Sequence, residues 1–174
     1  MSELVILVDE KDNQIGVEEK LKAHQEGILH RAFSVFILNS KKELLLQRRA
    51  LGKYHSPGLW TNTCCSHPRP DEDVLASAHR RLREEMGFDC DLSEIFTFQY
   101  KVSFDNGLTE HELDHVIIGN YEKDPIPNLA EVAEYKWVNI FSLEESIEKN
   151  PELYTEWLKI CYQKVKEYIK ENLS

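Results

Sequence analysis

Residues with metal-ligand and proton-transfer chemistry occur in three separate stretches of the sequence. They are His24, His30, Cys65, His67, Glu110 and Glu112. Glu110 and Glu112 are spaced i, i+2, so on a strand their side chains point to one side of the sheet. Two neighbouring carboxylates repel each other unless a cation or a proton lies between them. Imidazole and carboxylate groups together suit Zn²⁺, Mn²⁺ or Mg²⁺, and the sequence leaves the choice among these ions open.

Each of these residues also has a simpler interpretation when it is taken alone. Glu110 and Glu112 fit a solvent-facing stripe at the edge of a hairpin. Cys65 fits an inert buried thiol, and His67 fits a surface loop residue. A lone histidine is more often structural than functional. Because all of these residue types occur together, we expect one site that binds a divalent metal.

Residues 66–88 resemble the Nudix signature, Gly-x5-Glu-x7-Arg-Glu-U-x-Glu-Glu-x-Gly-U, in which U is apolar. The matching positions are Ser66, Glu72, Arg80, Arg81, Leu82, Glu84, Glu85, Gly87 and Phe88. Ser66 replaces the first Gly, and Arg81 replaces the first Glu of the helix. The resemblance implies a Nudix fold with an impaired hydrolytic metal cluster and an added cation for a diphosphate oxygen. The alternative is an ordinary charged helix face, with Arg80 and Glu84 paired at i, i+4.

Longer segments of the chain resemble the type I isopentenyl diphosphate isomerase family. They are His24, residues 30–36 (His-Arg-Ala-Phe-Ser-Val-Phe), residues 48–51 (Arg-Arg-Ala-Leu), residues 57–68 (Pro-Gly-Leu-Trp-Thr-Asn-Thr-Cys-Cys-Ser-His-Pro), Tyr100 and residues 110–112 (Glu-His-Glu). The resemblance runs from about residue 4 to residue 158. It implies a metal-dependent isomerase that interconverts isopentenyl diphosphate and dimethylallyl diphosphate in isoprenoid biosynthesis.

The same resemblance implies a role for each candidate residue. The metal ligands are His24, His30, His67, Glu110 and Glu112, with Cys65 included in the ligand set and Glu85 assigned to a Mg²⁺ ion that arrives with the substrate. The diphosphate contacts are Lys20, Arg49, Lys53 and Arg81. The catalytic residues are Cys65, Glu112, Tyr100 and Trp157. The family often has Pro just before this tryptophan, where the chain has Glu156.

The reaction moves one double bond, which requires a proton donor and a proton acceptor at the carbon chain. We expect Glu112 to donate a proton to the alkene, with Tyr100 beside it. We expect Cys65 to take a proton from the neighbouring carbon, which requires thiolate character. The cationic intermediate needs an electron-rich wall, and an indole face such as that of Trp157 contributes about 2 kcal/mol when desolvated. This interpretation places the thiol and the carboxyl group on opposite sides of a small apolar cavity.

Two other functions stay open on the sequence. The first is a Nudix-type hydrolase of nucleoside diphosphate derivatives, which Glu84, Glu85 and Gly87 favour and Arg81 disfavours. The second is a non-catalytic metal-binding or interaction module that has kept the fold.

The strands that position these residues follow from hydrophobic patterning and turn signals. We expect a hairpin over about residues 4–19, strands over residues 32–38, 43–47 and 134–139, and a hairpin whose strands, residues 95–104 and 112–121, flank Asp105-Asn106-Gly107. Residues 50–63 and 124–128 contain Gly or Pro and are expected to be loops.

Three helices are expected as well. One begins after the acidic cap of residues 71–73, continues over residues 74–86 and ends at Gly87. A second covers residues 142–149, with Ser142 and Glu145 as a capping box. The third covers residues 151–171 with Pro151 as its first residue. Its apolar face comprises Leu153, Trp157, Cys161, Val165, Tyr168 and Ile169. Together, the C-terminal helices cover about residues 142–172.

This order of elements predicts an α/β (α+β) fold of the Nudix kind, in which helices sandwich a mixed β-sheet within one domain over residues 1–174. The net charge of −10 disfavours nucleic-acid binding, and no apolar run is long enough for a membrane helix. Without an export signal, the four cysteines are expected to be reduced in the cytoplasm. We therefore expect a prenyl diphosphate as the partner of a monomer or a small homo-oligomer.

Overall fold

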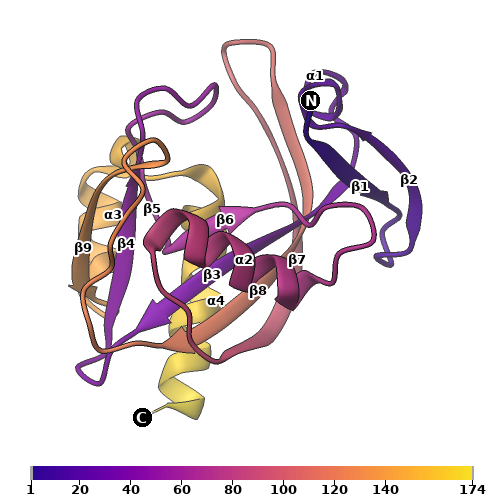
Figure 1. Ribbon diagram of the computed structural model, residues 1–174. Helices are drawn as coiled ribbons and strands as arrows, with labels where there is room; N and C mark the ends of the chain where they lie inside the picture. Colours follow the sequence, from indigo (N-terminus) through magenta and orange to yellow (C-terminus); the bar gives the residue numbers. More distant parts are fainter. Residues whose placement is uncertain (1, 174) are drawn as a thin grey trace.

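A computed structural model describes residues 2–173 of the chain (Figure 1). The strands are β1 (Leu4–Val8), β2 (Gln14–Glu19), β3 (His30–Leu38), β4 (Glu43–Arg49), β5 (Trp60–Thr61), β6 (Cys64–Ser66), β7 (Leu92–Ser103), β8 (Thr109–Asn120) and β9 (Val132–Asn139). The helices are α1 (Lys20–Glu26), α2 (Val74–Met86), α3 (Leu143–Lys149) and α4 (Glu156–Asn172), with a 3₁₀ turn at Pro151–Leu153.

Strand β3 lies at the centre of the mixed sheet. It runs parallel to β8 and antiparallel to β1, β4 and β6. The β1–β2 hairpin continues the sheet on one side, β4 pairs with β9 and β5 on the other, and β7 pairs with β8. Nearly all of β3 is buried, as expected for a strand that is covered on both faces.

The two faces of β3 pack against different helices. Phe33, Val35 and Ile37 pack with the apolar side of α2, whereas Phe36 and Leu38 pack with that of α4. This alternation follows from the two-residue period of a strand. Helices α2 and α4 therefore lie on opposite faces of the sheet (Figure 1), and the predicted mixed sheet between helices is confirmed.

Helix α2 has the predicted bounds because both of its ends are capped. The side chain of Asp73 accepts a hydrogen bond from the backbone of Ala76 at the N-terminus. Gly87 ends the helix with φ of 72°, a left-handed conformation that favours glycine. A Cβ atom on Gly87 would lie 2.4 Å from the carbonyl oxygen of Ile126, so the close approach also requires glycine.

Helix α1 and the short strand β6 were not predicted, and two further differences concern strands. Strand β5 lies inside the expected loop of residues 50–63, where it pairs with β4. The hairpin strands β7 and β8 begin about three residues earlier than predicted and extend almost to the turn. The turn itself is confirmed, since Gly107 has φ of 82°.

The C-terminal helices also differ from the prediction. Ser142 has no side-chain capping bond and instead donates its hydroxyl to the carbonyl of Asn139, so the expected capping box is wrong. The predicted helix of residues 151–171 is divided, because Tyr154 pairs with Trp60 and the backbone N–H of Thr155 donates to the Trp60 carbonyl. This tertiary pairing makes α4 begin at Glu156.

Division of the helix also changes its predicted apolar face. Leu153 lies in the 3₁₀ turn with 46% of its surface exposed, so its assignment to the buried face is wrong. Trp157, Cys161, Val165 and Ile169 are buried as expected. Among residues 2–173, no helix combines the length and the apolar character that a membrane crossing needs.

Candidate active site

Four of the predicted metal ligands meet in the interior. His24 lies on α1, His30 begins β3, His67 follows β6 and Glu112 lies on β8. One potential ligand atom from each of these buried residues lies within 4.8 Å of the others. The parallel register pairs His30 with Glu112, so two elements far apart in sequence bring the imidazole and the carboxylate together.

Hydrogen bonds to backbone carbonyls define which ring nitrogen carries the proton in two of the histidines. Nδ1 of His24 lies 2.7 Å from the Lys20 carbonyl oxygen, and Nδ1 of His30 lies 2.8 Å from that of Ile28. Because a carbonyl only accepts, each Nδ1 carries the proton and a neutral ring has its lone pair on Nε2. Burial, together with the nearby His67, lowers the pKa of His24 to about 4, which favours that neutral form.

Ring nitrogens of two of these histidines face one carboxylate. Nε2 of His30 lies 3.1 Å and Nε2 of His67 lies 2.5 Å from Oε2 of Glu112, while the buried Nε2 of His24 has no hydrogen-bond partner in residues 2–173. Each of these nitrogen–oxygen contacts needs a proton or a cation between its two atoms. The four donor atoms therefore fit a divalent metal ion.

Glu110, the fifth predicted ligand, lies beside this group. Its Oε1 is 3.1 Å from Nε2 of His55, and these two residues form a second cluster of potential ligands with His24. The hydroxyl of Tyr100 donates to Glu110 at 3.0 Å and also donates to Glu112. Tyr100 lies opposite Glu112 in the β7–β8 register, as expected for a residue placed next to that carboxyl group.

The remaining two predicted ligands, Cys65 and Glu85, belong to neither cluster. Glu85 is buried on α2, where it accepts a hydrogen bond from the Cys64 thiol at 2.8 Å and lies 3.6 Å from Arg81. Alternation along β6 turns Cys64 toward α2 and Cys65 to the opposite face. The inclusion of Cys65 in the ligand set is therefore not supported by its position.

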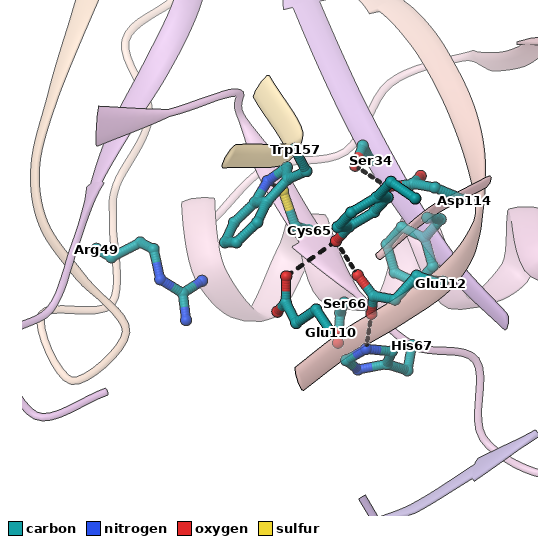
Figure 2. Close-up of a pocket in the computed structure, with 12 residues that line it drawn as sticks. Ser34, Arg49, Cys65, Ser66, His67, Glu110, Glu112, Asp114 and Trp157 are labelled. Atoms are coloured by element: carbon teal, nitrogen blue, oxygen red, sulfur yellow. Dashed lines mark hydrogen bonds and ion pairs between the residues drawn. The ribbon is translucent and has the colours of Figure 1, made fainter. Parts of the chain in front are cut away.

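Cys65 and Glu112 both face one small cavity of about 30 Å³, which Tyr100 and Trp157 also line (Figure 2). The complete lining is Ala32, Phe33, Ser34, Arg49, Cys65, Ser66, His67, Tyr100, Glu110, Glu112, Asp114 and Trp157. Many of these side chains are polar or charged. The expected apolar surface comes from Ala32, Phe33 and the rings of Tyr100 and Trp157, and the polar groups lie among them.

The thiol of Cys65 is held between an indole and an amide. Nε1–H of Trp157 donates to the sulfur at 3.0 Å, and the thiol donates to Oδ1 of Asn62 at 3.0 Å. Burial and the nearby Asp114 raise the pKa of Cys65 to about 12. This high pKa favours the neutral thiol over the expected thiolate in the resting group. The guanidinium of Arg49 lies 5.3 Å from the centre of the Trp157 ring, so the indole already contacts one cation.

The carboxyl groups of the cavity differ in charge. Burial and the charge of Glu112 raise the pKa of Glu110 well above its usual range. Burial also raises the pKa of Glu112, but His67 and His30 outweigh burial and hold that pKa well below its usual range. These opposite shifts favour the negative charge on Glu112 when no ion is bound, which reduces the repulsion between two buried neighbours.

The structure adds two residues to the site that the sequence interpretation missed. Asp114 continues the i, i+2 spacing of Glu110 and Glu112 and accepts a hydrogen bond from Ser34 at 2.7 Å, so the strand pattern contained the signal for it. His55 lies in the loop between β4 and β5, where no periodic pattern indicates which way a side chain points.

The four predicted diphosphate contacts, Lys20, Arg49, Lys53 and Arg81, line one larger pocket of about 200 Å³. This pocket adjoins the first cavity, since Arg49, Cys65, Ser66 and His67 line both. The buried Nε atoms of Arg49 and Arg81 have no hydrogen-bond partner among the described residues. Lys20 pairs with Glu3, and Lys53 pairs with Glu131, and both carboxylates also line the pocket. The two unpaired guanidinium N–H groups are therefore the donors that this pocket offers to an anion.

Comparison with known proteins identifies the class to which this fold and site belong. Residues 28–158 match the NUDIX domain family. A crystal structure of a Deinococcus radiodurans protein is 18% identical, with a TM-score of 0.78 over 93% of this chain and 98% of that one. A MutT protein from Methanosarcina mazei is 20% identical, with a TM-score of 0.65 over 80% of this chain and 94% of that one. The chain thus has a Nudix domain.

Curated relatives define the family more closely. Isopentenyl-diphosphate Delta-isomerase 2 of Aromatoleum aromaticum is 53% identical over 95% of this chain and 87% of the relative. The protein of that name from Photorhabdus laumondii is 51% identical over 97% of this chain and 98% of the relative. Isopentenyl-diphosphate Delta-isomerase of Pectobacterium atrosepticum is 49% identical over 94% and 92%. The chain belongs to the isopentenyl-diphosphate Delta-isomerase family, and the predicted family is confirmed.

Proposed function

We propose that the chain interconverts isopentenyl diphosphate and dimethylallyl diphosphate in the cavity that Cys65 and Glu112 share. The observation that carries this proposal is that a thiol and a carboxyl group line one small cavity, next to a pocket whose lining includes four cations. The carbon chain of the substrate would lie in the first space and its diphosphate in the second. Membership of the isomerase family supports the reaction.

Cys65 and Glu112 would exchange protons with the substrate at two neighbouring positions. In the direction that forms dimethylallyl diphosphate, the neutral thiol of Cys65 gives its proton to the terminal alkene carbon, and a tertiary cation develops. The ionised carboxylate of Glu112 then takes a proton from the carbon on the diphosphate side. Because the reaction is reversible, each group has the opposite role in the reverse direction.

This order reverses the roles expected from the sequence, because Cys65 rests as a thiol rather than a thiolate. Tyr100 would hold Glu112 in place through its hydroxyl, and Trp157 would form a wall of the cavity and keep the sulfur oriented through its N–H group. Exclusion of water by these aromatic rings would protect the cation from capture.

A divalent ion fits the lone pairs of His24, His30 and His67 and the carboxylate of Glu112, with Glu110 beside them. Three imidazoles favour Zn²⁺ or Mn²⁺ over Mg²⁺, which prefers oxygen ligands. When bound, such an ion would stabilise the ionised form of Glu112.

The diphosphate would be held by Lys20, Arg49, Lys53 and Arg81. Mg²⁺ would accompany it, because diphosphate oxygens are ligands that this ion prefers. Glu85 is the proposed protein ligand of that Mg²⁺, since its carboxylate lies next to the Arg81 side chain that lines the pocket.

The proposal is tested by incubating the metal-loaded protein with isopentenyl diphosphate and Mg²⁺ in deuterated water. NMR would report movement of the double bond and incorporation of deuterium together. Cys65→Ala and Glu112→Gln should each lower turnover about 10²–10⁴-fold, the usual contribution of a general acid or base. Cys90→Ser, which changes a free thiol outside both cavities, should not.

The same preparations would be assayed for phosphate or nucleotide release from a panel of nucleoside diphosphate derivatives. Hydrolysis of a nucleotide without double-bond movement would identify a Nudix hydrolase instead. Binding of the prenyl diphosphate without deuterium incorporation would identify a binding module.

A further inference from the structure

His55 is a buried histidine that the proposed chemistry does not use. It lies in the loop between β4 and β5 with 6% of its surface exposed. Its ring lies 4.7 Å from that of Tyr54, 5.8 Å from that of Phe104 and 6.0 Å from that of Trp157, measured between ring centres. Three aromatic neighbours restrict the ring to one orientation, so its polar atoms have fixed directions.

One of those atoms points to Glu110. Nε2 of His55 lies 3.1 Å from Oε1 of Glu110, while the hydroxyl of Tyr100 contacts the other oxygen at 3.0 Å. The carboxyl group is thus held from both sides, by one contact on each oxygen. Glu110 is itself 2% exposed, so its carboxyl group is shielded from bulk solvent.

The backbone of the same loop is anchored to the site at two points. A terminal nitrogen of Arg49 donates to the carbonyl of His55 at 3.3 Å, and the side chain of Asn106 donates to the carbonyl of Tyr54 at 2.9 Å. Arg49 lines both cavities, and Asn106 lies at the turn between β7 and β8. The position of His55 is therefore fixed relative to the strand that carries Glu110.

We infer that His55 is a positioning residue that orients the Glu110 carboxylate toward the metal-ligand group. This inference rests on the proposed function, in which a divalent ion is held beside Glu110. Carboxylates that bind metals are commonly fixed by hydrogen-bond partners outside the ligand set, and loss of such a partner typically lowers metal affinity 10–100-fold. His55 holds the oxygen of Glu110 that Tyr100 does not reach.

Amide replacements separate this role from simple filling of space. In His55→Gln, the side-chain amide extends to about the position of Nε2 and can donate to Glu110. In His55→Asn, the same amide ends near the position of Nδ1 and does not reach Glu110. His55→Leu removes hydrogen bonding altogether. His79→Leu removes a histidine that pairs with Asp89 on the outer side of α2 and serves as the control.

The affinity of each full-length variant for Mn²⁺ and for Zn²⁺ would be measured by competition with a chelator of known affinity. We expect a loss of about 10–100-fold for His55→Asn and His55→Leu, a loss of less than about threefold for His55→Gln, and no change for His79→Leu. Isomerisation would fall in the same order and recover when Mn²⁺ is raised to saturation. Near-ultraviolet circular dichroism would establish that each variant is folded.

Two results would overturn the inference while leaving the proposed function intact. One is an unchanged metal affinity in His55→Asn and His55→Leu. The other is an equal loss in His55→Gln and His55→Asn, which would indicate that His55 binds the ion directly or only fills space. Failure of the unaltered protein to bind either ion would instead contradict the proposed metal site, and with it this inference.

Discussion

Nε1–H of Trp157 donates a hydrogen bond to Sγ of Cys65 over 3.0 Å, although 92 residues separate the two in the sequence. Trp157 reaches the sulfur because α4 begins at Glu156, just after Thr155 pairs with Trp60 and Thr61. The break before α4 thus determines which residue of that helix faces the cavity.

Replacement of Trp157 by Phe keeps an aromatic wall and removes the N–H donor. Since a donor stabilises a thiolate, its loss should raise the pKa of Cys65 further and slow proton transfer. One neutral hydrogen bond contributes about 1 kcal/mol, so kcat should fall about fivefold with little change in KM. The pH dependence of Cys65 alkylation, followed on the Cys65 peptide by mass spectrometry, would measure the pKa shift.

Trp137 provides the matched control, because its Nε1–H donates to Asp124 away from the cavity. Trp137→Phe should leave both kcat and Cys65 alkylation unchanged. An alkylation profile for Trp157→Phe identical to that of the unaltered protein would show that this hydrogen bond does not influence the thiol.

The predictable parts of the fold are those with strong local signals. Asp73 and Gly87 define both ends of α2 by capping, and Asn106-Gly107 defines the turn between β7 and β8. Helix α1 lacks such a signal at its start, since Glu19 makes no side-chain capping bond. Its seven residues are too few for an independent helix, and the helix depends on the burial of Ala23 and His24 against the sheet.

The candidate site likewise has a part that local sequence patterns predict and a part that they do not. Strand alternation placed Glu110 and Glu112 on one side of the sheet, and it applies equally to Asp114, which the sequence interpretation overlooked. The orientation of His55 depends on aromatic contacts with residues as distant as Trp157. The protonation state of Cys65 depends on burial and on Asp114. Such properties arise from tertiary packing, which no local pattern specifies.

Gly87→Ala should destabilise the protein strongly. The left-handed backbone at this position costs a residue with a Cβ about 1–2 kcal/mol, and the clash with the Ile126 carbonyl at 2.4 Å adds about 1–3 kcal/mol of overpacking. The sum of these costs is a loss of about 2–5 kcal/mol in the free energy of unfolding. Urea titration followed by circular dichroism would measure it.

Gly107→Ala separates the two costs, because Gly107 has φ of 82° but no atom within 4 Å of an added Cβ. It should lose only about 1–2 kcal/mol. Equal losses in the two variants would mean that the contact with Ile126 relaxes at no cost.

Removal of divalent ions should lower thermal stability. In the folded protein the ring nitrogens of His30 and His67 lie at hydrogen-bond distance from Glu112, and an ion bound among these groups should favour the folded state over the unfolded one. At about one hundred times its dissociation constant, an ion that binds only the folded state adds about 2.7 kcal/mol. Chelation should therefore lower Tm, and added Mn²⁺ or Zn²⁺ should raise it with a dependence on concentration.

His24→Asn removes one of the four clustered ligands and should weaken this dependence. His111→Asn changes a histidine of β8 that belongs to neither ligand cluster and should retain it. A Tm that is insensitive to chelator, or equal metal responses in the two variants, would contradict the proposed ligand set.

Asp114 should make the protein less stable as pH rises. Burial and the charge of Glu112 raise the pKa of Asp114 well above its usual range. Between the unfolded and folded pKa values, the folded state holds a proton that the unfolded state has released. The free energy of unfolding therefore falls with increasing pH in this window, by at most about 1.4 kcal/mol per pH unit for one group. Below the pKa of the unfolded state, Asp114 is protonated in both states, and its contribution to the free energy of unfolding is fully retained.

Asp114→Asn keeps the shape and an acceptor for Ser34 but cannot ionise, so it should remove this part of the pH dependence. We expect the variant to match the unaltered protein near pH 4 and to become progressively more stable than it toward pH 7 or above. Urea unfolding across this range, with a chelator present in every sample, would measure the difference. The control Asp91→Asn, at an exposed position, should differ from the unaltered protein by the same free energy of unfolding at every pH. A constant offset for Asp114→Asn as well would mean that this carboxyl group is ionised in the folded protein, and that the cavity carries one more negative charge beside Cys65.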